Sequence, residues 1–237
     1  MKLTLLERLL ALGRDGGCAA LATHLKTGAQ RLVSPIADEG DLALTAEELA
    51  RVRQVLDGDR SGTIQTDSGP VFVELWIPRL RLIVVGAVHT AQSLVPLAIL
   101  AGYEVTVVDP RTAFATPARF PGITLRHDWP DTAVLALKPD RRTAVVTLTH
   151  DAKIDDPALV AAMRSDAFYI GALGSRRTHA KRAERLTASG FDRMAIARVR
   201  GPIGLAIGAL TPAEIALSIM AEVTAVLRRA PLACRAE

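Results

Sequence analysis

A chain of 237 residues that is 49% hydrophobic is long enough for a sizeable core and too apolar to be disordered. Its aromatic content of 4% argues against base stacking, and its formal net charge of +4 argues against a polyanion-binding coat, so we expect no nucleic-acid partner. The two cysteines, Cys18 and Cys234, make no CxxC motif and no disulfide framework. We therefore expect a cytoplasmic protein with reduced thiols and no metal site.

The first 78 residues predict a small α+β domain. Its predicted elements are, in order, a helix over 3–12, a strand over 18–25, a polar stretch, a helix over 45–56 and two short strands, the last over 71–77. Charged residues inside the apolar run of the first helix are typical of an amphipathic helix rather than of a signal peptide. Thr45 and Glu48 have the spacing of a capping box. No flexible linker follows Pro78, so we expect this domain, residues 1–78, to pack tightly on the rest.

Over residues 79–237, strands and helices alternate. Strands are predicted over 81–86, 104–109, 123–127, 143–149, 167–172 and 196–200, and helices over 90–102, 156–164, 176–190 and 211–229. This alternation of helices with nearly continuous apolar strands predicts an α/β domain with a Rossmann-like, doubly wound parallel sheet. The uncharged run over 82–103 is long enough for a bilayer, but polar residues in its middle predict a buried strand, turn and helix, so we expect no membrane partner.

Ligands of such sheets bind at the carboxyl ends of the strands, so the residues after each strand are the candidates for a site. The first strand ends at Gly86, and the second closes with Asp109, which is placed to accept hydrogen bonds from a ribose. His89 stands at the following helix start, where it would contact an anion or a ring, or cap its own helix. Val88 occupies the place of the second glycine of a dinucleotide turn, where its side chain would crowd a pyrophosphate.

The turn "TLTHDAKIDDPAL" offers His150 and Asp151 at the same edge of the sheet. A histidine beside a carboxylate suits a proton shuttle or a ligand contact, and the alternative is ordinary loop polarity. The next helix is predicted to be capped by Asp155 or Asp156, with Pro157 at its first position.

The turn "YIGALGSRRTHAKRAERL" gathers positive charge at a helix start, where the backbone dipole is already positive. The residues that we assign to a ligand here are Gly171, Gly174, Ser175, Arg176 and Arg177. The glycines would let the backbone approach the ligand, Ser175 would cap the helix, and the two arginines would bind phosphate or pyrophosphate. The later cations, Lys181, Arg182 and Arg185, are expected to form a solvated basic face.

A fourth turn contains an open glycine-rich loop over 201–208, which would either wrap a ligand around Gly204 or fit a tight crossing. Thr211 and Glu214 form a capping box behind it, with Pro212 at the first helical position.

Five segments occur in one order between residues 79 and 227: "VVGAVHTAQ", "VTVVDPR" with "RFPG", "TLTHDAKIDDPAL", "FYIGALGSRRTHAKR" and "GPIGLAIGALTPAEIALSIMAE". Together they resemble the XdhC/CoxI family of molybdenum-enzyme accessory proteins. The resemblance implies a homodimeric chaperone that binds the molybdenum cofactor, a molybdopterin that carries a phosphate or is a dinucleotide. It also implies that the chaperone protects the cofactor during sulfuration and delivers it to a xanthine-dehydrogenase-like molybdenum hydroxylase. The implied partners are the apo form of that enzyme and a cysteine desulfurase.

The cofactor-binding residues that we predict are Gly86, His89, Asp109, His150, Asp151, Gly171, Gly174, Ser175, Arg176, Arg177 and Gly204. No base, nucleophile and orienting group gather among the strand-end residues, so we assign no catalytic residue. The alternative is an NAD(P)-dependent oxidoreductase on the same sheet. Val88 and the lack of a Tyr-x-x-x-Lys pair argue against it.

Overall fold

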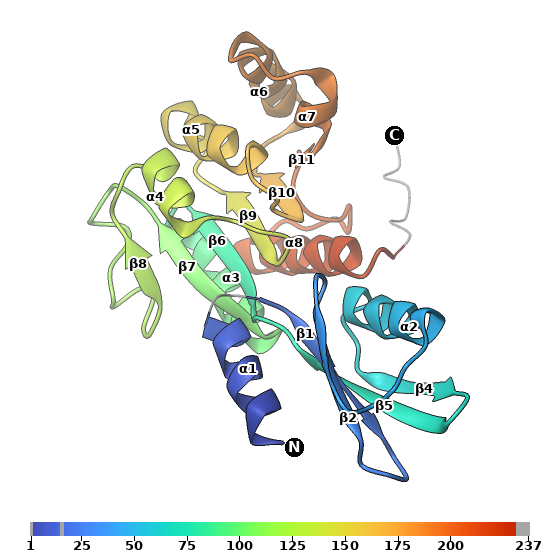
Figure 1. Cartoon of the computed structure of the whole chain (residues 1–237). Helices are drawn as coiled ribbons and strands as arrows, with labels where there is room; N and C mark the ends of the chain where they lie inside the picture. The colour runs from blue at the N-terminus through green and yellow to red at the C-terminus, as the bar shows by residue number, and fades with distance from the viewer. Residues whose placement is uncertain (1, 15–16, 231–237) are drawn as a thin grey trace. The chain divides into compact units, whose positions relative to one another are not determined.

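The computed structural model describes residues 2–14 and 17–230, which form two compact units whose boundary in the chain lies between Pro78 and Arg79 (Figure 1). The elements described in the first unit are α1 (Leu3–Arg14), β1 (Ala19–His24), β2 (Gln30–Val33), β3 (Asp38–Gly40), α2 (Ala46–Asp57), β4 (Gly62–Thr66) and β5 (Gly69–Trp76). The strands form an antiparallel sheet in the order β3-β2-β1-β5-β4.

A helix covers each face of this first sheet. Successive side chains of a strand point to opposite faces. In β1, Ala20 therefore joins a core with Val52 of α2, whereas Leu21 joins a second core with Leu5 of α1.

Two strands of the first unit, β2 and β3, fall in the stretch predicted only as polar. Ser34 begins the turn between them, where its N–H donates to the carbonyl of Ala37 at 2.8 Å. Arg31 of β2 forms an ion pair with Asp38 of β3. Polar cross-strand contacts support the pairing, and Leu32 and Val33 of β2 are buried in the two cores. The strands are too short to show an alternation that would have predicted them.

The second unit contains a six-stranded, entirely parallel sheet in the order β11-β10-β9-β6-β7-β8 (Figure 1). Its strands are β6 (Leu80–Val85), β7 (Tyr103–Val108), β8 (Thr124–Arg126), β9 (Thr143–Thr147), β10 (Tyr169–Ala172) and β11 (Val199–Arg200). Its described helices are α3 (His89–Leu100), α4 (Pro130–Leu137), α5 (Ala152–Met163), α6 (Arg176–Ala188), α7 (Arg193–Ala197) and α8 (Pro212–Leu227). The chain leaves β6 towards β7 and later returns to its other side at β9. The predicted Rossmann-like α/β fold is therefore confirmed, with the switch point between β6 and β9.

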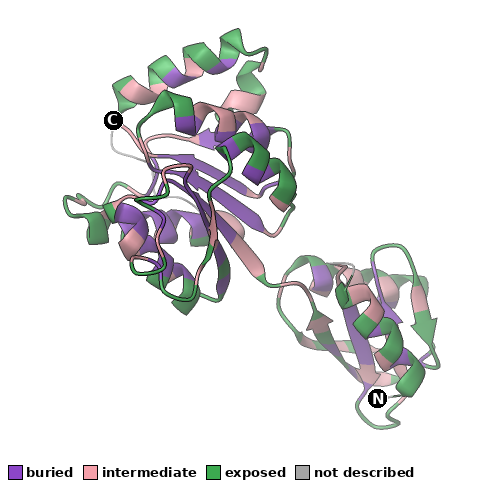
Figure 2. Cartoon of the chain, turned by 90° about the vertical axis from the view of Figure 1, so that its left-hand side faces the viewer, coloured by how far each residue is buried: buried purple, intermediate pink, exposed green. Residues whose placement is uncertain are grey.

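Helices cover both faces of the parallel sheet and bury its strands, which are drawn in purple in Figure 2. Val84 of β6 packs on the side of α3 and α8, with Leu94 and Ile219. Val85, the next residue, packs on the opposite side with Leu159 of α5. The apolar strands read as continuous runs because both of their faces are buried.

The helices of the second unit differ from the prediction in three places. Helices α4 and α7 were not predicted at all, and α5 begins at Ala152, several residues earlier than expected. The Asp151 side chain caps α5 by accepting the N–H of Lys153 at 2.9 Å, and Pro157 lies inside the helix. Asp155 does not cap the helix, because its carboxylate is turned inward to accept N–H groups from the preceding loop.

Both predicted capping boxes are confirmed, with Thr45 and Glu48 at the start of α2 and Thr211 and Glu214 at the start of α8. The uncharged run over 82–103 becomes β6 and α3, as predicted. In the parts of the chain that the structure describes, no helix combines the length and apolar character needed to cross a bilayer.

Candidate functional site

The turns after β6 and β9 press against each other at the carboxyl edge of the sheet. Gly86 has a φ of +105°, and a Cβ atom there would lie 2.5 Å from the Cγ2 atom of Thr149. Both the left-handed backbone and this close approach require glycine. Gly86 therefore brings the two predicted ligand-facing turns together. His89 is exposed at the start of α3, and His150 is exposed in the turn after β9.

Asp109 closes β7 at the strand edge, as predicted, but its side chain is bonded within the protein. Its side chain is completely buried, and its oxygens accept hydrogen bonds from the Ala87 N–H at 2.8 Å and from the Arg111 Nε and Nη2 atoms at 2.9 and 2.8 Å. Burial alone would raise the pKa of Asp109, but the hydrogen bonds from Arg111 and Ala87 outweigh it and hold this pKa below its ordinary value. As placed, Asp109 supports the first turn and orients Arg111, so a ribose would have to displace Arg111 to reach it.

Asp155 organises the turn after β9. Its carboxylate accepts the Thr149 hydroxyl at 2.7 Å and the His150 N–H at 3.1 Å. These bonds hold His150 in the left-handed region, at a φ of 62°. The side chain of Asp151 caps α5. In the predicted His150–Asp151 pair, the carboxylate therefore has a structural role.

A buried ion pair joins this turn to α6. Arg182 lies 3.8 Å from Asp155, and its Nη2 atom donates to the carbonyl of Leu173 at 2.9 Å. The expectation of a solvated basic face is therefore wrong for Arg182, and Arg185 also pairs with Asp156 of α5, at 3.0 Å between Nη2 and Oδ1. Burial raises the pKa of Asp155 and lowers the pKa of Arg182, while their mutual attraction opposes both shifts.

Helix α6 starts as predicted, with the Ser175 hydroxyl accepting the Thr178 N–H at 3.1 Å. Arg176 and Arg177 are exposed in the first turn of this helix. Gly174 has a φ of +145°, which glycine adopts without strain. The structure thus presents two guanidinium groups beside the helix N-terminus at the strand edge.

Gly171 and Gly204 are required by packing inside the protein. A Cβ atom on Gly171 would lie 2.5 Å from the Cδ1 atom of Ile203. Gly204 has a φ of +90°, and its N–H donates to the buried carboxylate of Glu222 at 2.8 Å. Glu222 also accepts the Tyr169 hydroxyl at 2.6 Å, so it connects β10, the glycine-rich loop and α8. Internal packing therefore accounts for both glycines, which favours the tight crossing over a wrapped ligand as the role of the loop over 201–208.

A cavity of about 410 Å³ lies between the turn after β10 and the glycine-rich loop. Its walls are largely apolar, and Arg176 is the charged residue among them. The lining includes Leu173, Gly174, Arg176, Ile203, Gly204 and Ile215. Three predicted site residues, Gly174, Arg176 and Gly204, therefore line one cavity. The volume and lining are typical of a small-molecule site.

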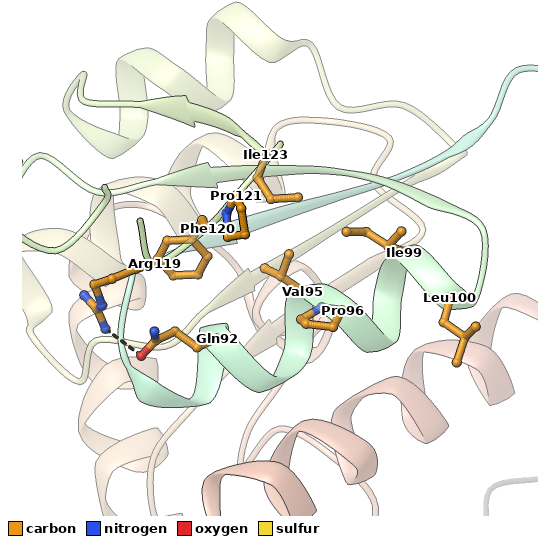
Figure 3. Close-up of a pocket in the computed structure, with 9 residues that line it drawn as sticks. All are labelled: Gln92, Val95, Pro96, Ile99, Leu100, Arg119, Phe120, Pro121 and Ile123. Carbon is orange, nitrogen blue, oxygen red and sulfur yellow. Dashed lines mark hydrogen bonds between the residues drawn. The ribbon is translucent and has the colours of Figure 1, made fainter. Parts of the chain in front are cut away.

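A second cavity, of about 380 Å³, lies along α3 (Figure 3). Val95 and Ile99 of α3 face Phe120 and Ile123 from the chain after β7. At one end, the Arg119 Nη2 atom donates to the side chain of Gln92 at 3.0 Å. None of the predicted site residues lines this cavity.

The sequence did not predict that four further residues contribute to the site: Arg111, Asp155, Arg182 and Glu222. Arg111 follows the strand-end aspartate directly in "VVDPR", and this proximity was the available signal. Asp155 was assigned only to capping, whereas it accepts bonds from the turn before α5. Nothing local marks Arg182 and Glu222, because their partners lie on other elements. Among the described residues, no three His, Cys, Asp or Glu side chains gather in a way that could hold a metal ion.

The strand order and the glycine turns at the switch point define a Rossmann-type α/β domain, and the cavity at the strand ends is its candidate ligand site. The model of the XdhC Rossmann domain family matches residues 82–223. The chain belongs to this family, and the predicted XdhC membership is confirmed.

Two curated relatives agree with this assignment. The chain is 34% identical over 149 residues to the molybdenum cofactor insertion chaperone PaoD of Escherichia coli K12, covering 63% of this chain and 41% of PaoD. It is 31% identical over 160 residues to a Bacillus subtilis 168 protein named as a probable xanthine dehydrogenase subunit, covering 67% of this chain and 46% of that protein. The chain thus spans less than half the length of these curated relatives.

A crystal structure described as a xanthine dehydrogenase from Bacillus halodurans superposes with a TM-score of 0.69 over 95% of this chain and 64% of that one. The sequence identity in that superposition is 22%, so the match supports the fold alone.

Proposed function

We propose that this chain is an accessory protein for the maturation of a xanthine-dehydrogenase-like molybdenum enzyme and that it binds the molybdenum cofactor. Family membership and the name of the PaoD relative support a role in cofactor insertion. The structural observation that carries the proposal is the cavity beside Arg176, at the carboxyl edge of the parallel sheet.

The residues of this cavity fit a phosphorylated pterin. Leu173, Ile203 and Ile215 offer apolar walls for a flat ring, and Arg176 offers a guanidinium for a phosphate. Arg177 adds a second exposed positive charge in the same helical turn. When bound, the cofactor would supply the redox chemistry of the client enzyme, whereas the residues of this chain would bind it, orient it and shield it from water.

The polar edge of the pterin would meet the exposed histidines of the neighbouring turns, His89 and His150. We propose a binding role rather than catalysis for His150, because the nearby carboxylates of Asp151 and Asp155 are used to cap α5 and to hold the loop. A general base would need an orienting partner of its own.

In this proposal the protein works in the cytoplasm as a homodimer. It receives the cofactor, protects it while a cysteine desulfurase sulfurates it, and transfers it to the apo molybdenum hydroxylase. The cofactor would be bound either as the pterin monophosphate or as its dinucleotide. The Bacillus subtilis relative, through the xanthine dehydrogenase in its name, supports the class of the client.

Reversal of the charges at the start of α6 tests the proposal. Arg176→Glu with Arg177→Glu should weaken pterin binding strongly, since each lost charge-assisted hydrogen bond removes roughly 1.5–3 kcal/mol. Arg193→Glu, at another exposed arginine in the same unit, is the matched control and should bind normally. Binding is measured by fluorescence titration, with circular dichroism to verify the fold. Unchanged affinity in the folded double variant would refute this assignment of the site.

A further inference from the structure

Arg111 is the guanidinium that the structure fixes most firmly at the strand edge. Its backbone N–H and its Nε atom donate to Oδ1 of Asp109, at 3.0 and 2.9 Å, and its Nη2 atom donates to Oδ2 at 2.8 Å. One face of the guanidinium lies 4.4 Å from the ring centre of Phe114. Two independent contacts therefore hold the group in one orientation.

The third nitrogen of Arg111, Nη1, has no hydrogen-bond partner among the residues that the structure describes. The Arg111 side chain is 36% exposed, whereas that of Asp109 is completely buried. The strand end therefore presents N–H donors to a ligand and withholds its carboxylate oxygens. A Rossmann sheet that binds NAD presents the opposite, an acidic residue whose oxygens accept the ribose hydroxyls.

The charges that act on Arg111 include those of the neighbouring turn after β9. The hydrogen bond to Asp109 is the main cause that raises the pKa of Arg111; burial opposes it, and the charges of Asp151 and Asp155 add to the rise. The last two residues belong to the turn and helix after β9, on the other side of β6. The guanidinium is therefore positive at any physiological pH and within electrostatic reach of the switch point.

We propose that Arg111 is a specificity-determining residue that binds an anionic phosphate oxygen of the ligand through its Nη1 atom. This inference rests on the proposed function and adds a second anion contact to the one at Arg176. Strands β7 and β10 are separated by β6 and β9, so the strand spacing places the two strands that lead to these arginines roughly 14 Å apart. An extended phosphorylated ligand that crosses the switch point would contact both.

The phosphate oxygen has two possible sources with the same chemistry. It belongs either to the phosphate of the pterin itself or to the additional phosphate of the dinucleotide form. The experiment therefore uses both probes, the pterin monophosphate and its dinucleotide, with the full chain.

The test compares Arg111→Gln with Arg119→Gln. Arg119 is the matched control, because it also lies near Phe114, at 5.8 Å from the ring centre, but hydrogen-bonds to Gln92 along α3. Arg111→Gln should lower the affinity between about tenfold and a hundredfold, the loss expected for one charge-assisted hydrogen bond. Loss for both probes assigns the contact to the phosphate of the pterin, and loss for the dinucleotide alone assigns it to the nucleotide.

Removal of Arg111 leaves the buried Asp109 without its main partner, so the single variant could unfold. The double variant Asp109→Asn with Arg111→Gln removes both charges, and Arg111→Lys keeps the positive charge. The double variant should lose affinity as the Gln variant does, and the Lys variant should lose less. Unchanged affinity for both probes in a folded Arg111→Gln or double variant would overturn the inference while the proposed function stands. Failure of the unmodified chain to bind either probe would overturn both.

Discussion

The carboxylate of Asp155 lies 3.8 Å from the guanidinium of Arg182, and both side chains are almost completely buried. Asp155 holds the backbone of Thr149 and His150 after β9, and Arg182 holds the carbonyl of Leu173 after β10. One ion pair thus ties together two turns of the candidate site. The positions of these turns depend on each other.

Removal of one partner of this pair should be costly. Arg182→Met leaves a buried carboxylate without its counter-charge and should lower the free energy of unfolding by about 3–5 kcal/mol. Asp155→Asn should also destabilise, but the double variant should lose less than the sum of the two single losses, because the partners are coupled. Denaturant unfolding of the four proteins gives this cycle. Additive losses would show that the two side chains are not coupled.

Asp109→Ala should destabilise the protein. It removes the acceptor for the buried N–H of Ala87 and for the guanidinium of Arg111, and unpaired donors cost about 1–3 kcal/mol each. The measurement is the melting temperature of the variant against the unmodified chain. An unchanged melting temperature together with lost ligand binding would instead assign Asp109 to the ligand, as the sequence alone suggested.

Asp109 should also contribute to the loss of folding stability at acid pH. Although burial alone would raise it, the pKa of Asp109 is held below its ordinary value by hydrogen bonds from Arg111 and Ala87. The folded chain then holds this proton less tightly than the unfolded chain. The resulting stability is present above the unfolded pKa of about 3.9 and is lost as the pH falls through the folded pKa. Urea unfolding at about pH 6 and about pH 3 should show a smaller acid loss for Asp109→Asn than for the unmodified chain. Equal losses of unfolding free energy in both proteins would contradict the lowered pKa of Asp109.

The contact between the first two turns can be tested at Gly86. Gly86→Ala should cost about 1–3 kcal/mol from backbone strain, and more from the clash with Thr149. Gly102→Ala is the matched control, since Gly102 has a φ of +89° but nothing within 4 Å of an added Cβ atom. Adding Thr149→Ser to Gly86→Ala removes the clashing methyl group and should recover part of the loss. Equal melting temperatures of the Gly86 and Gly102 variants would exclude the clash.

NAD should bind weakly, with a dissociation constant near millimolar or higher, about 4 kcal/mol of binding free energy. We expect Val88 to crowd the approach of a pyrophosphate, and Arg111 already occupies the oxygens of Asp109. Val88→Gly alone should therefore not restore tight binding. Isothermal titration of NAD and NADH tests both points. Low-micromolar binding by the unmodified chain would favour the oxidoreductase alternative.

The sequence predicted the parallel sheet well, because its strands are buried on both faces and read as continuous apolar runs. The capping boxes at Thr45 and Thr211 and the cap at Ser175 were also predictable, because each is local. Strands β2 and β3 could not be predicted, since they are only four and three residues long and depend on their neighbours in the sheet.

The candidate site was predicted at the level of turns but not of individual side chains. The strand-end rule located Gly86, His150 and Arg176 correctly at one edge. It could not show that Asp109 would be used internally, because that depends on a contact with Ala87 and on the side-chain orientation of Arg111. The sequence also could not show whether Asp155 would cap α5 or accept hydrogen bonds from the preceding turn.

The central claim is that this chain binds a phosphorylated pterin at the sheet edge. The most direct measurement is to purify the full chain, extract the small molecules that accompany it, and oxidise and identify them by fluorescence and mass. The account predicts a fluorescent pterin derivative above background, depleted in the Arg176→Glu, Arg177→Glu variant. A nicotinamide nucleotide in its place, or no small molecule above background, would contradict the account.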